Sequence, residues 1–365
     1  MATRVWKLFV LFSLLVGLPL LGVWVHGLPV HRYLVFPPPK AEYIDHAPFS
    51  WKAFCLYSLL IFSLTFPLAW RWIRSGRGAK KGGGGQQGRL PWWGYLGVVT
   101  GASAWILAWT RLEWFSPWQL HTFTPLWCSF ILVVNAISQK RGGKCFMLKR
   151  PRLFLLLFPA SSVFWWFFEY LNRFVQNWHY LGGEVSAGQY LLYGSISFST
   201  VLPAVLSTKE LLLTFPSLNQ AFSGFVRAPW INHPLLGAIL LLSASASLFF
   251  IGVCPNYLFP MLWVAPLLMI TGLQILGREP HVFAAISRGD WRDVVSAAFA
   301  ALLCGWFWEM WNYCSLAKWE YSVPFVQRFH LFEMPLLGYA GYLPFGLECY
   351  AVAGLVEGFL AEKSL

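Results

Sequence analysis

Ten stretches of about 20 predominantly apolar residues occur along this 365-residue chain, and they constrain its fold more than any other feature. A helix that crosses a bilayer needs about 20 such residues. The sixth and tenth stretches are interrupted by Ser, Gly and Pro. We expect membrane-spanning helices near residues 5–25, 52–70, 92–110, 119–137, 153–172, 188–206, 234–252, 258–276, 293–313 and 335–358.

The composition excludes the other classes of protein. Only 12% of the residues are charged and 57% are hydrophobic, whereas soluble domains carry about 25% charged residues. Disorder requires low hydrophobicity and high charge. The 22 Trp residues agree with many membrane–water interfaces, where Trp and Tyr concentrate. The sequence therefore predicts an all-α, multi-pass integral membrane protein of a plasma membrane or bacterial inner membrane.

The basic residues predict the orientation of these helices. If the N-terminus is cytoplasmic, 20 of the 27 Lys and Arg residues fall in cytoplasmic segments, alternating loop by loop. Cytoplasmic loops carry such an excess, and one missed span would invert every later loop. We therefore expect ten transmembrane helices with both termini in the cytoplasm. The net charge of +12 then reflects orientation, and no nucleic-acid partner is expected.

Two helices precede the rest of the chain, within residues 1–74. The first has the basic start and apolar core of a signal peptide but no clean cleavage site, which predicts a retained signal anchor. Residues 75–90 contain the run Gly82–Gly85 among basic residues, which is typical of a flexible cytoplasmic linker.

Two later stretches resemble each other, namely WWFFEYLNRFVQNWHY, which ends at Tyr180, and GWFWEMWNYCSLAKWEY, which ends at Tyr321. Both contain E-x-x-N followed by W-x-Y. The alignment pairs, in order, Glu169, Asn172, Trp178 and Tyr180 with Glu309, Asn312, Trp319 and Tyr321. The spans before and after these stretches also match. The pattern predicts an internal duplication.

The duplication divides the remaining chain. We expect a first four-helix repeat at residues 91–210, a cytoplasmic connector at 211–233 and a second four-helix repeat at 234–360. An even number of spans per repeat makes the repeats parallel. They would be related by an axis near the membrane normal, an arrangement known in transporters.

Three acidic residues, Glu169, Glu309 and Glu348, lie well inside predicted spans. Ionisable groups in a bilayer are costly and usually face the bundle interior or a cavity. Asn172 and Asn312 each follow a glutamate by three residues and share its helix face. One interpretation is that these pairs hydrogen-bond neighbouring helices and stabilise the bundle. The other is that the three glutamates supply acid–base groups to a site.

The residues around the glutamates are candidates for positioning a substrate. They are Asn172, Arg173, Asn312, Trp178, His179, Tyr180, Trp319 and Tyr321. The chain contains no H-x-x-H box, Asp cluster, phosphate loop or dinucleotide fingerprint, so we predict no metal and no cofactor. The seven Cys residues form no C-x-x-C; buried thiols are expected, and an outer disulfide is the alternative.

Three functions agree with these features. The first is a membrane-embedded enzyme that acts on an isoprenoid or lipid-like substrate by glutamate acid–base chemistry at the outer side of the membrane, with aromatic walls around the substrate. The second is a transporter or permease in which Glu348 couples ion or proton movement. The third is a non-catalytic partner in a membrane complex. The expected partners are membrane lipid and a hydrophobic small molecule.

Overall fold

The structure is a computed structural model that describes residues 2–78 and 88–362. Most of the predicted linker at 75–90, including Gly82–Gly85, lies outside the described residues. The fold is predominantly helical. One to three consecutive helical elements lie along each of the ten apolar stretches.

The long helices are α1 (Ala2–Val25), α2 (Trp51–Gly78), α3 (Trp92–Trp109), α4 (Phe123–Gly142), α6 (Pro151–Val175), α7 (Ala187–Phe198), α8 (Val201–Leu212), α10 (Pro234–Phe250), α12 (Ala265–Leu276), α13 (Arg292–Tyr313) and α14 (Tyr342–Glu362). The short helices are α5 (Phe146–Lys149), α9 (Pro216–Phe222) and α11 (Pro255–Leu258), with 3-10 turns η1 (Val30–Tyr33), η2 (Glu113–His121), η3 (Pro229–Asn232), η4 (Phe259–Leu262), η5 (Ala284–Arg288) and η6 (Leu336–Gly341).

Six helical segments of the described chain are long and apolar enough to cross a membrane. The number rises to eight if two bent pairs of helices each form one span. In the bent pairs, η2 meets α4 at 69°, and the α11–η4 segment meets α12 at 58°. Helix α10 is shorter, with 17 residues, and α3 has 18 residues of which four are Trp. The chain is therefore a helical membrane protein.

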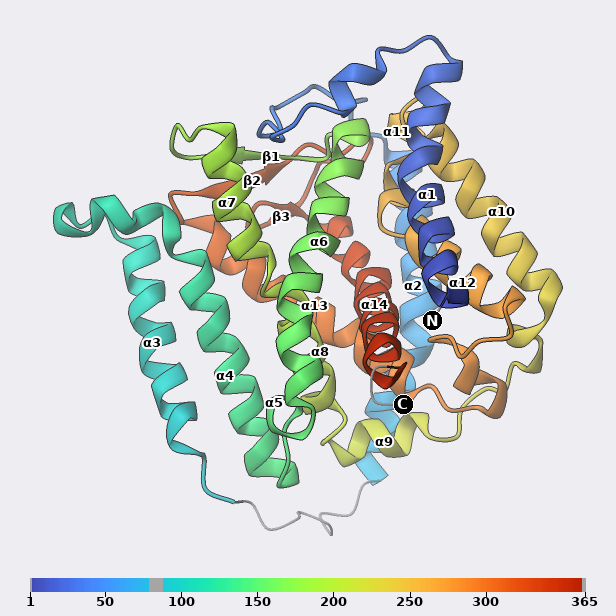
Figure 1. Cartoon of the computed structure of the whole chain (residues 1–365). Coiled ribbons are helices and arrows are strands. Elements are labelled where there is room, and N and C mark those ends of the chain that lie inside the picture. The colour runs from blue at the N-terminus through green and yellow to red at the C-terminus, as the bar shows by residue number, and fades with distance from the viewer. Residues whose placement is uncertain (1, 79–87, 363–365) are drawn as a thin grey trace.

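Figure 1 shows how the helices are arranged. Helices α3 and α4 lie side by side at one edge, and α1, α10 and α12 pack together at the other. Between them, α13 packs against both α8 and α14, and α6 packs against α8. The close contact of α1 with α10 depends on Gly22, because a Cβ there would lie 1.7 Å from the backbone oxygen of Phe249.

Four short strands were not expected from the apolar pattern. Strands β1 (Trp178–Leu181) and β2 (Lys318–Tyr321) form an antiparallel pair, and β3 (His330–Leu331) pairs with β4 (Met334–Pro335). Strand β1 follows α6, and β2 follows α13. We call this end of the molecule, at the top of Figure 1, the strand end. Helices α5 and α9 lie at the opposite end.

The segment between α1 and α2, residues 26–50, crosses the strand end and is called the crossover segment below. The backbone N–H of Tyr180 in β1 donates to the carbonyl of Ala41. The Ser322 hydroxyl, directly after β2, donates to the carbonyl of Ile44 at 2.9 Å. The His46 ring contacts the carbonyl of Gln176 at 3.1 Å. The crossover segment therefore covers the β1–β2 pair.

Candidate functional site

Glu169 of α6 is the centre of a first hydrogen-bond cluster. The residue is 7% exposed. Its Oε1 accepts hydrogen bonds from the indole N–H groups of Trp165, at 3.0 Å, and Trp178, at 3.1 Å, and from the Tyr180 hydroxyl at 2.5 Å. Its Oε2 accepts from the Tyr190 hydroxyl at 3.2 Å. Four aromatic donors from α6, β1 and α7 therefore satisfy this buried carboxylate, as a polar group away from water requires.

Glu309 of α13 is the centre of a matching cluster. Its Oε1 accepts from the hydroxyls of Tyr321, at 2.8 Å, and Tyr342, at 2.6 Å. The indole N–H of Trp319 donates to the Tyr321 hydroxyl at 2.8 Å. Glu309 is fully buried, and its Oε2 has no hydrogen-bond partner among the described residues. In each cluster, therefore, the tyrosine two residues after the repeated Trp donates to the glutamate. Only the Glu169 carboxylate has hydrogen-bond partners on both of its oxygens.

The repeated asparagines hold the chain between each helix and its strand. The Asn172 amide donates to the Trp178 carbonyl at 2.8 Å, and its oxygen accepts from the backbone N–H of Asn177 at 2.8 Å. The Asn312 amide donates to the Trp319 carbonyl at 2.7 Å, and its oxygen accepts from the N–H of the same residue at 2.9 Å. Both asparagines are buried. Through these bonds they hold the first residues of β1 and β2 against the ends of α6 and α13.

The β1–β2 register brings the two clusters together. Trp178 lies opposite Tyr321, and Tyr180 lies opposite Trp319. The equivalent residues of the two repeated stretches are thus exchanged across a local two-fold axis that passes between His179 and Glu320. An antiparallel pair places residues on one face of the ladder in contact.

His179 and Glu320 lie opposite each other at the centre of the strand pair. Their Nε2 and Oε2 atoms lie 3.9 Å apart, and the Glu320 carboxylate also pairs with Lys318 at 2.8 Å. Burial lowers the pKa of the His179 imidazole, and the charge of Glu320 partly opposes this effect. The ring of Tyr43, from the crossover segment, contacts His179 edge-on. The imidazole is therefore enclosed by the strand pair and the crossover segment.

Burial also changes the two strand tyrosines. It raises the pKa of Tyr180 well above its ordinary value, and the charge of Glu169 raises it further. The same two causes, burial and then the Glu309 charge, raise the pKa of Tyr321. Both hydroxyls therefore keep their protons at neutral pH and act as hydrogen-bond donors to the carboxylates.

A cavity of about 530 Å³ lies beneath the β1–β2 pair. This volume falls in the usual range of small-molecule sites, about 300–1,000 Å³. Its walls are predominantly apolar and come from α2, α6, α7, α13, α14, η4, η6 and both strands. The aromatic residues in the walls include Trp165, Trp178, Tyr180, Tyr190, Phe198, Trp263, Trp308, Trp319, Tyr321 and Tyr342.

The predicted site residues divide around this cavity. Trp178, Tyr180, Trp319 and Tyr321 line it. The remaining candidates are absent from the described part of its wall, namely Glu169, Glu309, Glu348, Asn172, Arg173, Asn312 and His179. The two repeated glutamates lie directly behind wall residues to which they hydrogen-bond.

Two of the candidates make contacts elsewhere. The Arg173 guanidinium donates to the carbonyls of Tyr33, at 2.7 Å, and Val35, at 3.1 Å, and so holds the crossover segment. Glu348 of α14 is fully buried, and its Oε1 accepts from the backbone N–H of Leu267 in the first turn of α12 at 3.1 Å. Glu348 thus supplies a hydrogen-bond acceptor to a helix N-terminus that lacks a side-chain cap of its own.

Sequence reasoning missed several residues of the site. Trp165, Tyr190 and Tyr342 contact the glutamates, and Trp263 and Trp308 line the cavity. Tyr190 and Tyr342 lie in the spans that follow the two strands, which the duplication had already singled out. A buried glutamate needs hydrogen-bond donors, so the tyrosines of those spans are the sequence signal that identifies Tyr190 and Tyr342.

In the described chain, no three His, Cys, Asp or Glu side chains are placed to hold a metal ion. All seven cysteines lie among the described residues and are free thiols. No family model, curated protein or solved structure matches this chain.

Proposed function

We propose that this protein is a membrane-embedded enzyme that holds an isoprenoid or lipid-like substrate in the aromatic cavity and acts on it by acid–base chemistry. One observation carries the proposal: tyrosines that line a single apolar cavity hydrogen-bond to two separate buried carboxylates. In this proposal the glutamates act through Tyr180 and Tyr321, and not by direct contact with the substrate.

In this proposal one cluster gives the substrate a proton and the other takes a proton from it, so the substrate is rearranged without a co-reactant. A tyrosine hydroxyl protonates the substrate and is reprotonated by the glutamate behind it, which begins the cycle as a neutral carboxyl group. The glutamate of the other cluster begins as a carboxylate and receives, through its tyrosine, a proton from another point of the substrate. That proton then returns to the first glutamate before the next turnover. The aromatic faces of Trp165 and Trp308 would stabilise the positive charge that develops between the two steps.

The membrane topology is part of the proposal. We infer ten crossings, both termini in the cytoplasm, and parallel four-helix repeats at residues 91–210 and 234–360 in a plasma or bacterial inner membrane. The paired contacts α3–α4 and α10–α12 support the repeats, as do the two bent helix pairs and the exchanged partners in β1 and β2. The cavity would then lie toward the outer side of the membrane.

The alternatives have less support. A transporter coupled through Glu348 would need that carboxylate on a path, but its Oε1 is bonded to the Leu267 backbone and it lies away from the described cavity wall. A purely structural role explains the saturated Glu169 but leaves the cavity, which is lined by tyrosines of both clusters, without a purpose.

Paired Glu169→Gln and Glu309→Gln variants test the proposal, with Glu348→Gln as a matched buried glutamate away from the cavity. Each purified protein is assayed for thermal stability and for co-purifying lipid by mass spectrometry. We expect the first two variants to fold and to retain a lipid-like species with the same mass as that in the parent but a different fragmentation spectrum, because the rearrangement, which changes structure and not composition, stops. If both lose stability with no change in bound lipid, while Glu348→Gln keeps it, the glutamates are structural and the proposal fails.

A further inference from the structure

Helix α2 is attached to the rest of the molecule at its two ends. At the strand end, the N–H of Ser50 donates to the Phe325 carbonyl at 2.9 Å, and the N–H of Phe325 donates to the carbonyl of Ala47 at 3.1 Å. At the opposite end, the Arg71 guanidinium donates to the carbonyls of Ala221 and Gly224. The Trp72 indole donates to a hydroxyl of α9 at 3.2 Å.

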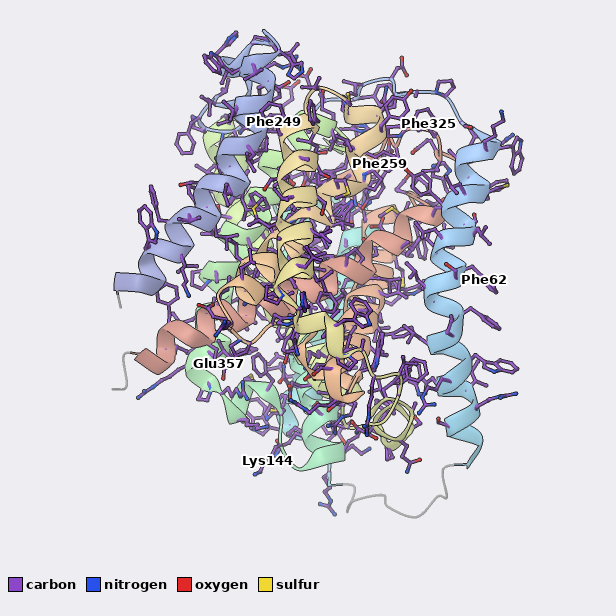
Figure 2. All side chains as sticks on the ribbon, turned by 90° about the vertical axis from the view of Figure 1, so that its right-hand side faces the viewer. Phe62, Lys144, Phe249, Phe259, Phe325 and Glu357 are labelled. Atoms are coloured by element: carbon purple, nitrogen blue, oxygen red, sulfur yellow. The ribbon has the colours of Figure 1, made fainter. Side chains whose placement is uncertain are left out.

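The middle of α2 has no comparable attachment. Among the described residues, the side-chain hydrogen bonds of Ser63 and Thr65 go to carbonyls of α2 itself, and none joins this part of the helix to another element. The apolar span of α2 contains no buried residue. Figure 2 shows α2 at the edge of the bundle, with Phe62 near its middle. Between its ends α2 makes only peripheral contacts, such as that of the Tyr57 ring with Phe259 of η4, and a helix held in this way moves sideways at a lower cost than a helix of the core.

This unpacked part of α2 forms one wall of the cavity. Leu60, Ile61, Leu64 and Thr65 line the cavity from α2, and residues of η4 and η6 line it as well. Leu60 is 52% exposed and Leu64 is 65% exposed, so both also border the surroundings of the protein. The cavity therefore opens sideways past these two leucines.

The opening lies at the depth of the hydrocarbon core. Counted along α2, Leu60 is about 14 Å from Trp51, the first residue of the candidate span, and Leu64 is about 17 Å from its last residue, Ser75. Because the hydrocarbon core is about 30 Å thick, both leucines would lie near its middle. At the strand end, by contrast, the crossover segment covers the strand pair above the cavity.

We propose that the middle of α2 is the movable side of a lateral entrance, and that the ligand is an apolar chain dissolved in the bilayer rather than a water-borne molecule. This inference rests on the proposed function and names the source and chemistry of its substrate. The chain passes between Leu60 and Leu64 of α2 and the η4–η6 side, and reaches the tyrosines from the membrane.

A photolabelling experiment tests this route. The protein, in phosphatidylcholine vesicles, receives a hexadecyl chain that carries a diazirine, and cross-linked residues are identified over time by mass spectrometry. The double variant Leu60→Trp/Leu64→Trp narrows the entrance. Its matched control is Leu56→Trp/Leu59→Trp, at two exposed leucines of α2 that do not line the described cavity. Labelling of the exposed face of α3 reports folding and membrane insertion.

We expect the parent to become labelled at cavity residues such as Phe198. The Leu60→Trp/Leu64→Trp variant should be labelled there at least fivefold more slowly. The labelling rate of the Leu56→Trp/Leu59→Trp control should stay within twofold of that of the parent. A Leu60→Ala/Leu64→Ala variant should be labelled faster than the parent. An unchanged rate in both Leu60/Leu64 variants overturns the lateral entrance and leaves the proposed function standing. Absence of cavity labelling in the parent overturns the proposed function as well.

Discussion

Substitution of Asn172 tests whether its hydrogen bonds stabilise the strand pair, because its side chain hydrogen-bonds only to backbone groups. An Asn172→Ala variant leaves the Trp178 carbonyl and the Asn177 N–H without the partners they now have at 2.8 Å each. Both bonds are buried. An unsatisfied buried backbone group costs about 1–3 kcal/mol. Two of them should lower the free energy of unfolding by about 2–6 kcal/mol.

The assay is unfolding of the purified protein in mixed micelles by increasing SDS, followed by near-ultraviolet circular dichroism. The control is Ser243→Ala, an exposed residue whose hydroxyl bonds only within its own helix; its loss should stay within about 0.5 kcal/mol. Asn312→Ala removes the same kinds of bonds in the second cluster and should cost a similar amount. A loss below about 1 kcal/mol for Asn172→Ala would refute the reasoning, because the strand would then satisfy its backbone without the asparagine.

Three further predictions concern other parts of the molecule. Gly346→Ala should destabilise the fold, because a Cβ there lies 2.1 Å from a backbone oxygen of α13. Gly354→Ala, in open space on the same helix, should raise the free energy of unfolding by about 1 kcal/mol. SDS unfolding compares the two variants, and equal effects would contradict the close packing at Gly346. His179→Gln should remove part of the loss of stability that acid causes. The pKa of the imidazole is lowered in the fold, so the unfolded chain binds the proton first and the stability of the parent falls as pH drops below about 6.5. Melting temperatures are compared at pH 7.5 and pH 5, and a parallel fall in parent and variant would refute this. Glu348→Gln keeps a hydrogen-bond acceptor for the α12 backbone, so the free energy of unfolding should change by less than about 1.5 kcal/mol and the bound lipid should stay the same. Loss of the lipid from this variant would instead support a role of Glu348 at the site.

The positions of the helices follow from the sequence because apolar length is a direct requirement of the bilayer. The breaks within them do not follow so simply. The fourth stretch bends sharply after His121, and the sixth is divided between Phe198 and Val201. Such breaks depend on packing against neighbouring helices, which no local pattern records. The divided sixth stretch still qualifies as one span, whereas the bends of the fourth and eighth stretches make the difference between six and eight qualifying spans. Helix α10, with 17 residues, is too short to qualify.

The candidate site was predicted only in part. The three-residue spacing of E-x-x-N correctly placed each pair on one helix face, because that spacing is a property of any α-helix. The tyrosines of the next spans were missed. Tyr190 follows β1 closely, whereas β3, β4 and η6 lie between β2 and Tyr342. Because this insertion changes the spacing in the second stretch, alignment of the two stretches cannot pair the tyrosines.

Glu348 and Arg173 illustrate a second limit. Their charge in an apolar sequence marks them as unusual, but charge alone does not tell a ligand contact from a structural bond. Glu348 bonds to a helix end that is distant in sequence, and Arg173 bonds to carbonyls of η1 and the residues after it. Both partners are backbone groups, which leave no signature in the pattern of residue types.

The pairing of β1 with β2 has a consequence for synthesis of the protein. Roughly 140 residues separate the two strands, and ribosomes add about 5–20 residues per second. After β1 has been synthesised, about 7 to 28 s therefore pass before β2 is made, and during this time the backbone groups of β1 that pair with β2 have no strand partner. During that interval the tyrosine that Glu169 needs is on an unpaired strand, so the first half of the site matures only after the second half has been made.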